Sequence, residues 1–203
     1  MRMPLILAGA ALAVATPIVA QQMPIPGTSD VSRVAAGTYK TDPAHTLIGW
    51  RVNHLGFNDY FGIFGDADGT LVLDPKKPAA AKLDVTIPIG KLTTASAGLT
   101  KHMMSKDFFN AEVTPTARFT STAVKVNGTR ATITGNLTMN GVTKPVVLNA
   151  RFTGAGANPM SKKPTIGFEA DAKIKRSDFN IAYGIPAVSD EVELDITAAF
   201  EQA

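Results

Sequence analysis

The chain has 203 residues, of which 18% are charged, with a formal net charge of +3 and no cysteine. This length suits a single domain, and so small a basic excess, spread along the chain, does not indicate a nucleic-acid binder. The lack of cysteine excludes thiol redox chemistry and disulfide cross-links, so an exported domain of this composition depends on core burial for its stability.

The first 20 residues have the pattern of a secretory signal peptide. Arg2 supplies a positive start, Leu5–Ala15 is apolar, and Ile18-Val19-Ala20 resembles a cleavage site before Gln21. The apolar stretch is shorter than the roughly 20 residues that span a bilayer, which favours a cleaved leader over an uncleaved membrane anchor.

Three segments follow from this pattern. We expect a signal peptide at 1–20, a flexible segment rich in proline and small polar residues at 21–37, and a folded domain at 38–203. The leader and the composition predict a periplasmic protein.

From residue 38 the sequence alternates between apolar and polar side chains, as strands do. Ile48, Trp50 and Val52 form the first clear row. A long strand is expected over 61–73, with glycines at 62, 65 and 69 marking bends where a sheet curls. After a turn at 74–78, another apolar row runs from Leu83 to Ile89.

The alternation stops between residues 95 and 110, where Leu99, His102 and Met103 recur at helical spacing and predict one short helix. Strands resume at 117–126 and 129–139 around a turn at Asn127-Gly128, and a second turn at Asn140-Gly141 leads into 144–153. A loop is expected at 154–164, strands at 165–175 and 191–200, and a long connection at 177–189.

The last strand shows the period most cleanly, because Val192, Leu194, Ile196, Ala198 and Phe200 all fall on one face. So many half-buried strands in a short chain must stack as a sandwich or close into a barrel. We expect an all-β fold, an antiparallel barrel of about eight strands with one short helix, which can hold one small ligand. An integral outer-membrane barrel is the alternative, but it predicts aromatic girdles that one Trp and three Tyr do not supply.

Several strings are more specific than this pattern, and in their order and spacing they resemble the YceI-like family of exported polyisoprenoid-binding proteins. They are D-P-A-H-T at 42–46, N-H-L-G-F at 53–57, H-M-M-S-K-D-F-F-N-A-E at 102–112 with P-T-A-R-F at 115–119, G-N-L-T-M-N-G-V-T-K-P-V at 135–146 and R-S-D-F-N-I at 176–181. The resemblance implies a lipocalin-like barrel with an elongated cavity for a long-chain lipid, such as a polyprenyl chain or an isoprenoid-quinone tail. The family usually has His where this chain has Asn140, and an acidic segment where this chain has K-L-T-T-A-S-A-G-L-T, so the polar end of the ligand stays open.

We expect a soluble carrier or binding protein for such a lipid, with no cofactor other than the lipid itself. Large apolar side chains could simply fill a core, but an eight-stranded barrel has one interior, so the residues that fill it also line any cavity. The expected ligand-binding residues are Ile48, Trp50, Val52, Phe61, Phe64, Ile87, Leu99, Met103, Phe108, Phe119, Leu137, Phe152, Phe168 and Phe179. A transient membrane contact and a homodimer are left open, and no nucleic-acid partner is expected.

Catalysis and metal binding have weaker signals. The three histidines are widely spaced, with neither H-x-H nor H-x-x-x-H, so hydrogen bonding is favoured over a metal site and no metal is expected. Asp107 and Asp178 each precede Phe, where Asp commonly caps backbone N–H groups. The alternative function is a lipid-modifying enzyme that uses His45, His54 and Asp107 inside the barrel.

Overall fold

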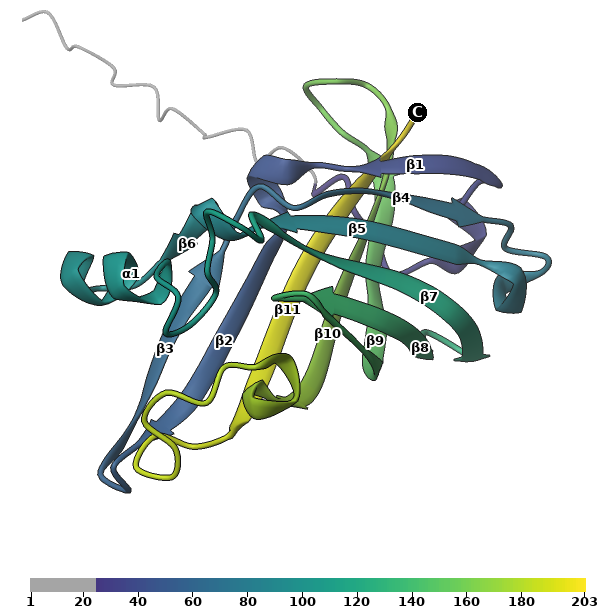
Figure 1. The fold of residues 1–203 in the computed structure, drawn as a ribbon. Helices are drawn as coiled ribbons and strands as arrows, with labels where there is room; N and C mark the ends of the chain where they lie inside the picture. The colour runs from purple at the N-terminus through teal and green to yellow at the C-terminus, as the bar shows by residue number, and fades with distance from the viewer. Residues whose placement is uncertain (1–24) are drawn as a thin grey trace, which may run out of the picture.

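The computed structural model describes residues 25–203, and the signal peptide expected at 1–20 lies outside these residues. Eight antiparallel strands form a closed barrel, because the sheet order runs from β1 to β11 and these two strands also pair with each other. The eight are β1 (Gly37–Thr41), β4 (Asp68–Leu73), β5 (Lys82–Pro88), β7 (Thr116–Asn127), β8 (Arg130–Met139), β9 (Val142–Ala157), β10 (Pro164–Lys175) and β11 (Glu191–Gln202) (Figure 1). The predicted antiparallel barrel of about eight strands is confirmed.

Three further strands, β2 (Leu47–His54), β3 (Asn58–Phe64) and β6 (Leu92–Thr93), extend the sheet from the same edge of β11. β1 pairs with residues 200–202 of β11, whereas β2 pairs with residues 193–197. The chain turns between these two strands at Asp42–Thr46, where the Asp42 side chain accepts from the Ala44 amide at 3.2 Å. The D-P-A-H-T string therefore builds a corner of the wall.

A matching corner follows at residues 65–67, so the single long strand expected over 61–73 is wrong. Asp66 has φ 53°, a left-handed conformation that no strand continues through, and Ala67 is fully buried in the bend. The chain forms β3 on one side of the bend and β4 on the other. The two corners lie between β1 and β2 and between β3 and β4. After them, β4 pairs with β1 and β5, whereas β3 pairs with β2.

The hairpins and connections differ from expectation in detail. The β7–β8 turn is centred on Gly128 and Thr129, since Asn127 already pairs with Arg130. The loop expected at 154–164 is shorter, because β9 runs to Ala157 and stays paired with β10 across a bulge at Gly167 and Phe168. Residues 25–36 lie against this extension of β9, where Thr28 forms a bridge with Ala155.

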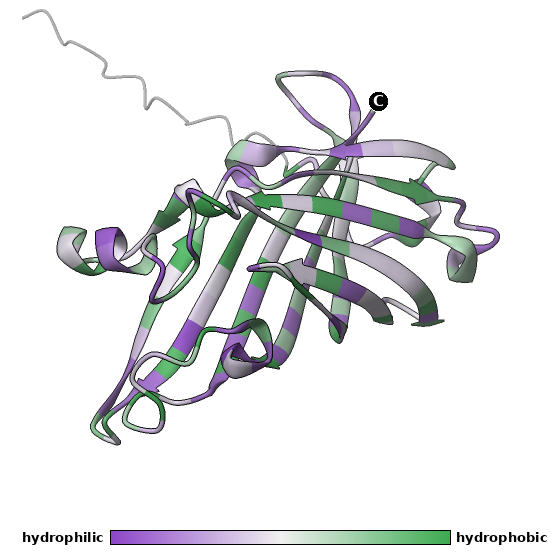
Figure 2. Cartoon of the chain, viewed as in Figure 1, coloured by the Kyte–Doolittle hydropathy of each residue, from purple (hydrophilic) through white to green (hydrophobic). Residues whose placement is uncertain are grey.

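The expected helix is present as α1 (Ala97–Met103), with Ser96 capping its first turn through a hydrogen bond from the Leu99 amide. The helix and the segment after it fill the wall between β6 and β7. Apolar and polar residues alternate as bands along strands such as β5 and β11 in Figure 2. The apolar faces point inward and form two clusters, a large one around Trp50 and Phe119 and a smaller one around Tyr39 and Phe200.

Candidate functional site

The barrel encloses a cavity of about 940 Å³. Val192, Leu194, Ile196, Ala198 and Phe200 of β11 all line it. At about 3.3 Å per residue, that row is about 26 Å long. The cavity therefore runs along most of the barrel, and its volume lies at the upper end of the range for sites that bind small molecules.

Two aromatic side chains in the cavity wall lie directly over glycines on neighbouring strands. A Cβ on Gly62 would come within 2.6 Å of Trp50 Cζ2, and a Cβ on Gly135 within 2.3 Å of Phe119 Cζ. These contacts are closer than any real Cβ permits, so each ring needs a glycine beneath it. The two glycines give the rings room to pack directly against the neighbouring strands.

Trp50 carries a second feature. Its indole Nε1 is buried and has no hydrogen-bond partner among residues 25–203. The side chain is 7% exposed, so this N–H is shielded from bulk water as well. Trp50 therefore contributes apolar surface to the site and forms no polar bond within the described chain.

The structure brings together most of the predicted ligand-binding residues. Twelve of them line the cavity: Ile48, Trp50, Val52, Phe64, Ile87, Leu99, Met103, Phe108, Phe119, Leu137, Phe152 and Phe168. Phe61 does not, because it lies on the outer face of β3 and is 70% exposed. Phe179 does not either: it is buried beside β9 in the short helix η5 (Arg176–Phe179) and packs in the core instead of facing the cavity.

Aliphatic residues supply much of the wall and were not among the predicted ligand-binding residues. Leu83 and Val85 of β5, Ile133 of β8, Leu148 of β9 and Ile174 of β10 all line the cavity. Each occupies the inward parity of a strand whose alternation is visible in the sequence. The signal was present, and a selection weighted toward aromatic residues overlooked it.

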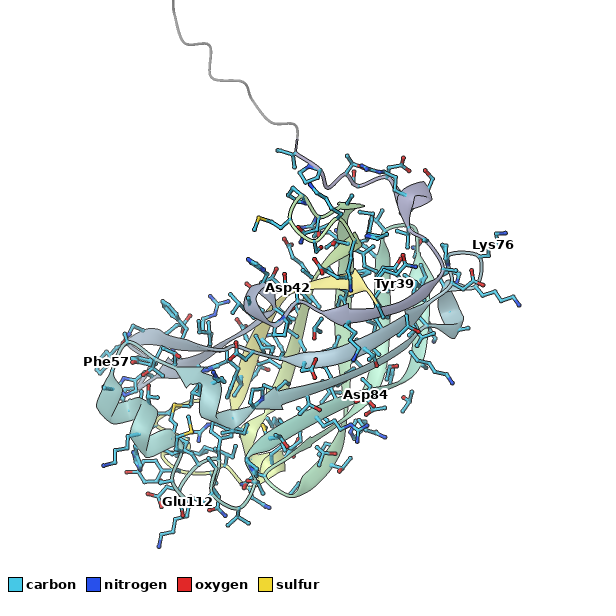
Figure 3. The ribbon with its side chains drawn as sticks, turned by 90° about the horizontal axis from the view of Figure 1, so that it is seen from above. Tyr39, Asp42, Phe57, Lys76, Asp84 and Glu112 are labelled. Atoms are coloured by element: carbon cyan, nitrogen blue, oxygen red, sulfur yellow. The ribbon has the colours of Figure 1, made fainter. Side chains whose placement is uncertain are left out.

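Lysine, arginine and histidine side chains line both ends of the cavity, and Thr41 and Thr46 line it at the corner between β1 and β2. At one end, Lys76 of the β4–β5 turn and Arg130 of β8 line it, and neither forms an ion pair among the described residues. At the other end the lining includes His54, His102 and Tyr183. Figure 3 shows Lys76 and Phe57, which follows His54 by three residues, at opposite ends of the molecule.

The end near Phe57 is shaped by Arg176, the buried cation of the R-S-D-F-N-I string. Its guanidinium donates to the carbonyl oxygens of Ser189 at 2.8 Å, Tyr183 at 2.7 Å and Val188 at 2.9 Å, and a fourth bond reaches Ile181 at 3.2 Å. Burial lowers the pKa of Arg176. The side chain therefore ties residues 181–189 into one fixed loop at the cavity mouth.

His102 connects this loop to α1. Its ring lies edge-on to Tyr183, with ring centroids 5.0 Å apart, and edge-on to Phe108 at 5.1 Å. Nε2 of His102 lies 3.0 Å from Asp107 Oδ2, which orients the ring. The three aromatic rings close the gap between the helix and the loop through side-chain contact.

The groups proposed for a lipid-modifying enzyme do not form a cluster. His45 lies at the Asp42–Thr46 corner, where its Nδ1 is 2.6 Å from Asp42 Oδ2, and it does not line the cavity. Asp107 pairs with His102, whereas His54 has no side-chain hydrogen bond in the described chain. Among residues 25–203, no group of three His, Cys, Asp or Glu side chains is placed to hold a metal ion.

Asn140 stands where the family usually has His, and the structure shows what it does here. Its Nδ2 donates to the carbonyl oxygens of Phe108 at 3.3 Å and Phe179 at 3.1 Å. Asn140 does not line the cavity. In this chain the position joins the segment after α1 to η5, so the substitution bears on the wall and not on ligand contact.

No helix within residues 25–203 is long and apolar enough to cross a membrane.

Comparisons with known proteins agree with this architecture. Residues 39–200 match the YceI-like domain. UPF0312 protein plu2095 from Photorhabdus laumondii is 45% identical over 170 residues, which cover 83% of this chain and 88% of that protein.

Solved structures show the same fold. The Campylobacter jejuni YceI protein has a TM-score of 0.65 and 33% identity, covering 74% of this chain and 90% of that one. A polyisoprenoid binding domain from Saccharophagus degradans has a TM-score of 0.62 and 15% identity, covering 81% of this chain and 98% of that one. With this match across the barrel from β1 to β11, the chain belongs to the family of YceI-like domains.

Proposed function

We propose that this protein binds a long-chain lipid in its barrel and carries or sequesters it in the periplasm. The observation that carries the proposal is the apolar cavity of about 940 Å³, which is lined by inward-facing side chains along the length of β11. A protein of the same fold described as polyisoprenoid binding supports an isoprenoid tail as the guest. The signal-peptide pattern at 1–20 supports export.

Apolar contact alone gives useful affinity in such a cavity. Burying ten methylene-sized groups at about 0.8 kcal/mol each stabilises the complex by roughly 8 kcal/mol, which corresponds to micromolar affinity before the costs of association. A longer tail binds more tightly. The same physics discriminates poorly among tails of similar length, so we expect one lipid class and not one lipid.

Binding is favoured over catalysis because most of the residues that line the cavity are apolar. The middle of the wall is built from side chains such as Ile48, Phe119 and Leu194, which offer no proton, nucleophile or metal ligand to a guest. A tail held there is hidden from water and left unchanged.

The test is native mass spectrometry of the protein purified from the periplasm of its own host, followed by solvent extraction of what it carries. We expect a long-chain lipid in the wild type. Ala131 and Ala150 pair across β8 and β9 and both line the cavity, so Ala150→Phe should fill the space and reduce the lipid load. Ala123→Phe on the exposed face of β7 is the matched control and should keep the load. A lipid-free wild type, or an undiminished load in Ala150→Phe, contradicts the proposal.

A further inference from the structure

We infer that the end of the barrel formed by the β2–β3 turn and residues 181–189 docks on the surface of a lipid bilayer, so that the cavity mouth opens onto the membrane. This inference rests on the proposed function and names the partner with which the binding site exchanges its lipid. It concerns two segments that are far apart in sequence and joined at the mouth, here called the apolar rim: residues 55–57 and 181–189.

The apolar rim is one structural unit. The Leu55 amide donates to the Ala187 carbonyl at 2.7 Å, and the Ser189 amide donates to the Asn53 carbonyl at 2.9 Å. Arg176 holds the second segment from behind through its carbonyl bonds. The rim therefore presents its side chains from a fixed backbone.

Its exposed side chains are apolar and free of charge. Phe57 is 86% exposed, Leu55 is 50% exposed and Tyr183 is 55% exposed. The chain has no charged residue between His54 and Asp59 or between Asn180 and Asp190. Contiguous exposed apolar surface of this kind marks an interaction site, and Phe and Tyr are typical of the boundary between a bilayer and water.

The turn itself carries a residue that folding chemistry disfavours. Leu55 and Gly56 have φ 58° and 72°, and the Phe57 amide closes the turn on the His54 carbonyl at 3.1 Å. The β8–β9 hairpin has positive φ at both equivalent positions and uses Asn140-Gly141, the pair that such turns prefer. A leucine in the left-handed region is strained, and asparagine would adopt the same backbone conformation at lower cost. The presence of leucine at an exposed tip therefore indicates a role outside the fold.

Two further features select a bilayer as the occupant. The rim is continuous with the cavity, since His54, Tyr183, Gly184 and Val188 all line it, and the guest proposed for that cavity is a membrane lipid. The rim also projects: Figure 3 shows Phe57 at the end of the molecule, and Figure 1 shows the β2–β3 turn reaching beyond the rest of the barrel. A projecting tip inserts among lipid headgroups, whereas a second protein would need a matching hollow.

Charge near the rim fits anionic headgroups. Lys101 and Lys106, on and after α1, are exposed and make no ion pair within the described chain, while Asp107 is paired with His102. Asp59, two residues after Phe57, lies 3.9 Å from Arg51, and Figure 3 labels Glu112, the other acid of the α1 segment, apart from Phe57. Lysines on the segment whose His102 contacts Tyr183 of the rim strengthen attachment to an anionic bilayer.

The experiment is flotation of the full mature chain with vesicles of phosphatidylcholine and with vesicles that also contain phosphatidylglycerol. We expect the wild type to float with both and more strongly with the anionic vesicles, at low ionic strength above all. Leu55→Asn and Phe57→Ser should each weaken vesicle binding about tenfold, since each removes one large apolar side chain from the contact. Leu55→Asn should fold at least as well as the wild type, because Asn suits the turn.

The matched control is Met160→Ser. Met160 is 88% exposed in the β9–β10 connection, at the opposite end of the barrel, and its loss should leave vesicle binding unchanged. A wild type that floats with neither vesicle overturns the inference. So does an equal loss in Met160→Ser, or a dimer in solution that Phe57→Ser dissociates without any vesicle binding.

Failure of docking is distinguishable from failure of the proposed function. Lipid loading from detergent solution bypasses the membrane, so Leu55→Asn should take up as much isoprenoid alcohol from detergent as the wild type. Uptake from vesicles should instead fall with the flotation. Normal loading from detergent without any flotation rejects the docking surface and keeps the lipid-binding barrel, whereas flotation without loading does the reverse.

Discussion

The guanidinium of Arg176 donates to the carbonyl oxygen of Tyr183 at 2.7 Å, across seven residues of chain. Three more carbonyls of the same loop accept from this side chain, which is 6% exposed. The hydrogen bonds of one buried cation thus hold this loop, in place of the backbone hydrogen bonds that would hold a strand. The shape of the cavity mouth depends on it.

Arg176→Lys should lower the free energy of unfolding by about 2–3 kcal/mol, since the lysine ammonium has three donors and cannot reach all four carbonyls. Urea denaturation measures the change. Arg130→Lys, at an exposed residue without an ion pair in the described chain, should change stability by less than about 0.5 kcal/mol. Equal effects at the two positions would contradict the assigned role.

Gly62→Ala should destabilise the fold by about 1–3 kcal/mol, because the new methyl would meet both Trp50 Cζ2 at 2.6 Å and the Thr93 carbonyl oxygen at 2.7 Å. Gly90→Ala is the control, since a Cβ there meets nothing within 4 Å. Thermal unfolding of both variants checks the difference. A neutral Gly62→Ala would mean that Trp50 has room to move.

Trp50→Asp and Phe119→Asp should unfold the protein or expel its lipid, because each places a carboxylate in an apolar wall that offers no partner. Trp50→Phe is the conservative variant for comparison. The indole Nε1 makes no hydrogen bond within the described chain, so this change should lower the free energy of unfolding only through the smaller buried ring area. Native mass spectrometry reports the lipid load of each variant. If both Asp variants keep a full load, the cavity assignment is wrong.

Stability should fall in acid partly through Asp190. Hydrogen bonds from the Ser177 amide and hydroxyl hold the pKa of Asp190 below its usual value, with the amide as the larger cause. A carboxylate with a lowered folded pKa stabilises the native state above its unfolded pKa of about 3.9, and this contribution is lost as the pH falls through the folded value.

Asp190→Asn should therefore lower the melting temperature at about pH 5 and narrow the gap from wild type at about pH 3. Melting temperatures across this range test the prediction. Asp195→Asn on the exposed face of β11 removes a charge but no hydrogen bond, so its melting curve should follow the wild type. A gap that widens toward low pH would reverse the sign argued here.

Local alternation was enough to predict the strands and most of the cavity wall, and it also explains one error. Phe61 and Phe64 are three residues apart on one strand, so they point to opposite faces and cannot both line the interior. Phe179 was beyond this reasoning, because a short irregular helix has no period that tells core from cavity.

Long-range geometry was not available from the sequence. Gly65 was expected to mark a bend in the strand at 61–73, but nothing in the sequence indicated that the bend would divide it into two strands, one of which reaches β5. The meeting of His102 with Tyr183 likewise joins segments whose spacing in sequence carries no signal. The strand pattern and the family resemblance both predicted the barrel, but the corners and the mouth became visible only in the structure.

The shared edge of β11 gives the two ends of the shell unequal stiffness. Where β1 meets residues 200–202, the circumference is an unbroken backbone ladder, whereas beyond β2 and β3 it is completed by rings and a short helix. Amide protons should accordingly exchange slowly around Phe200 and faster toward Phe57. By using one strand twice, the chain closes the rear with backbone hydrogen bonds and leaves the fixed mouth loop joined to α1 by side-chain contact alone, a seam that can part for a long flexible molecule.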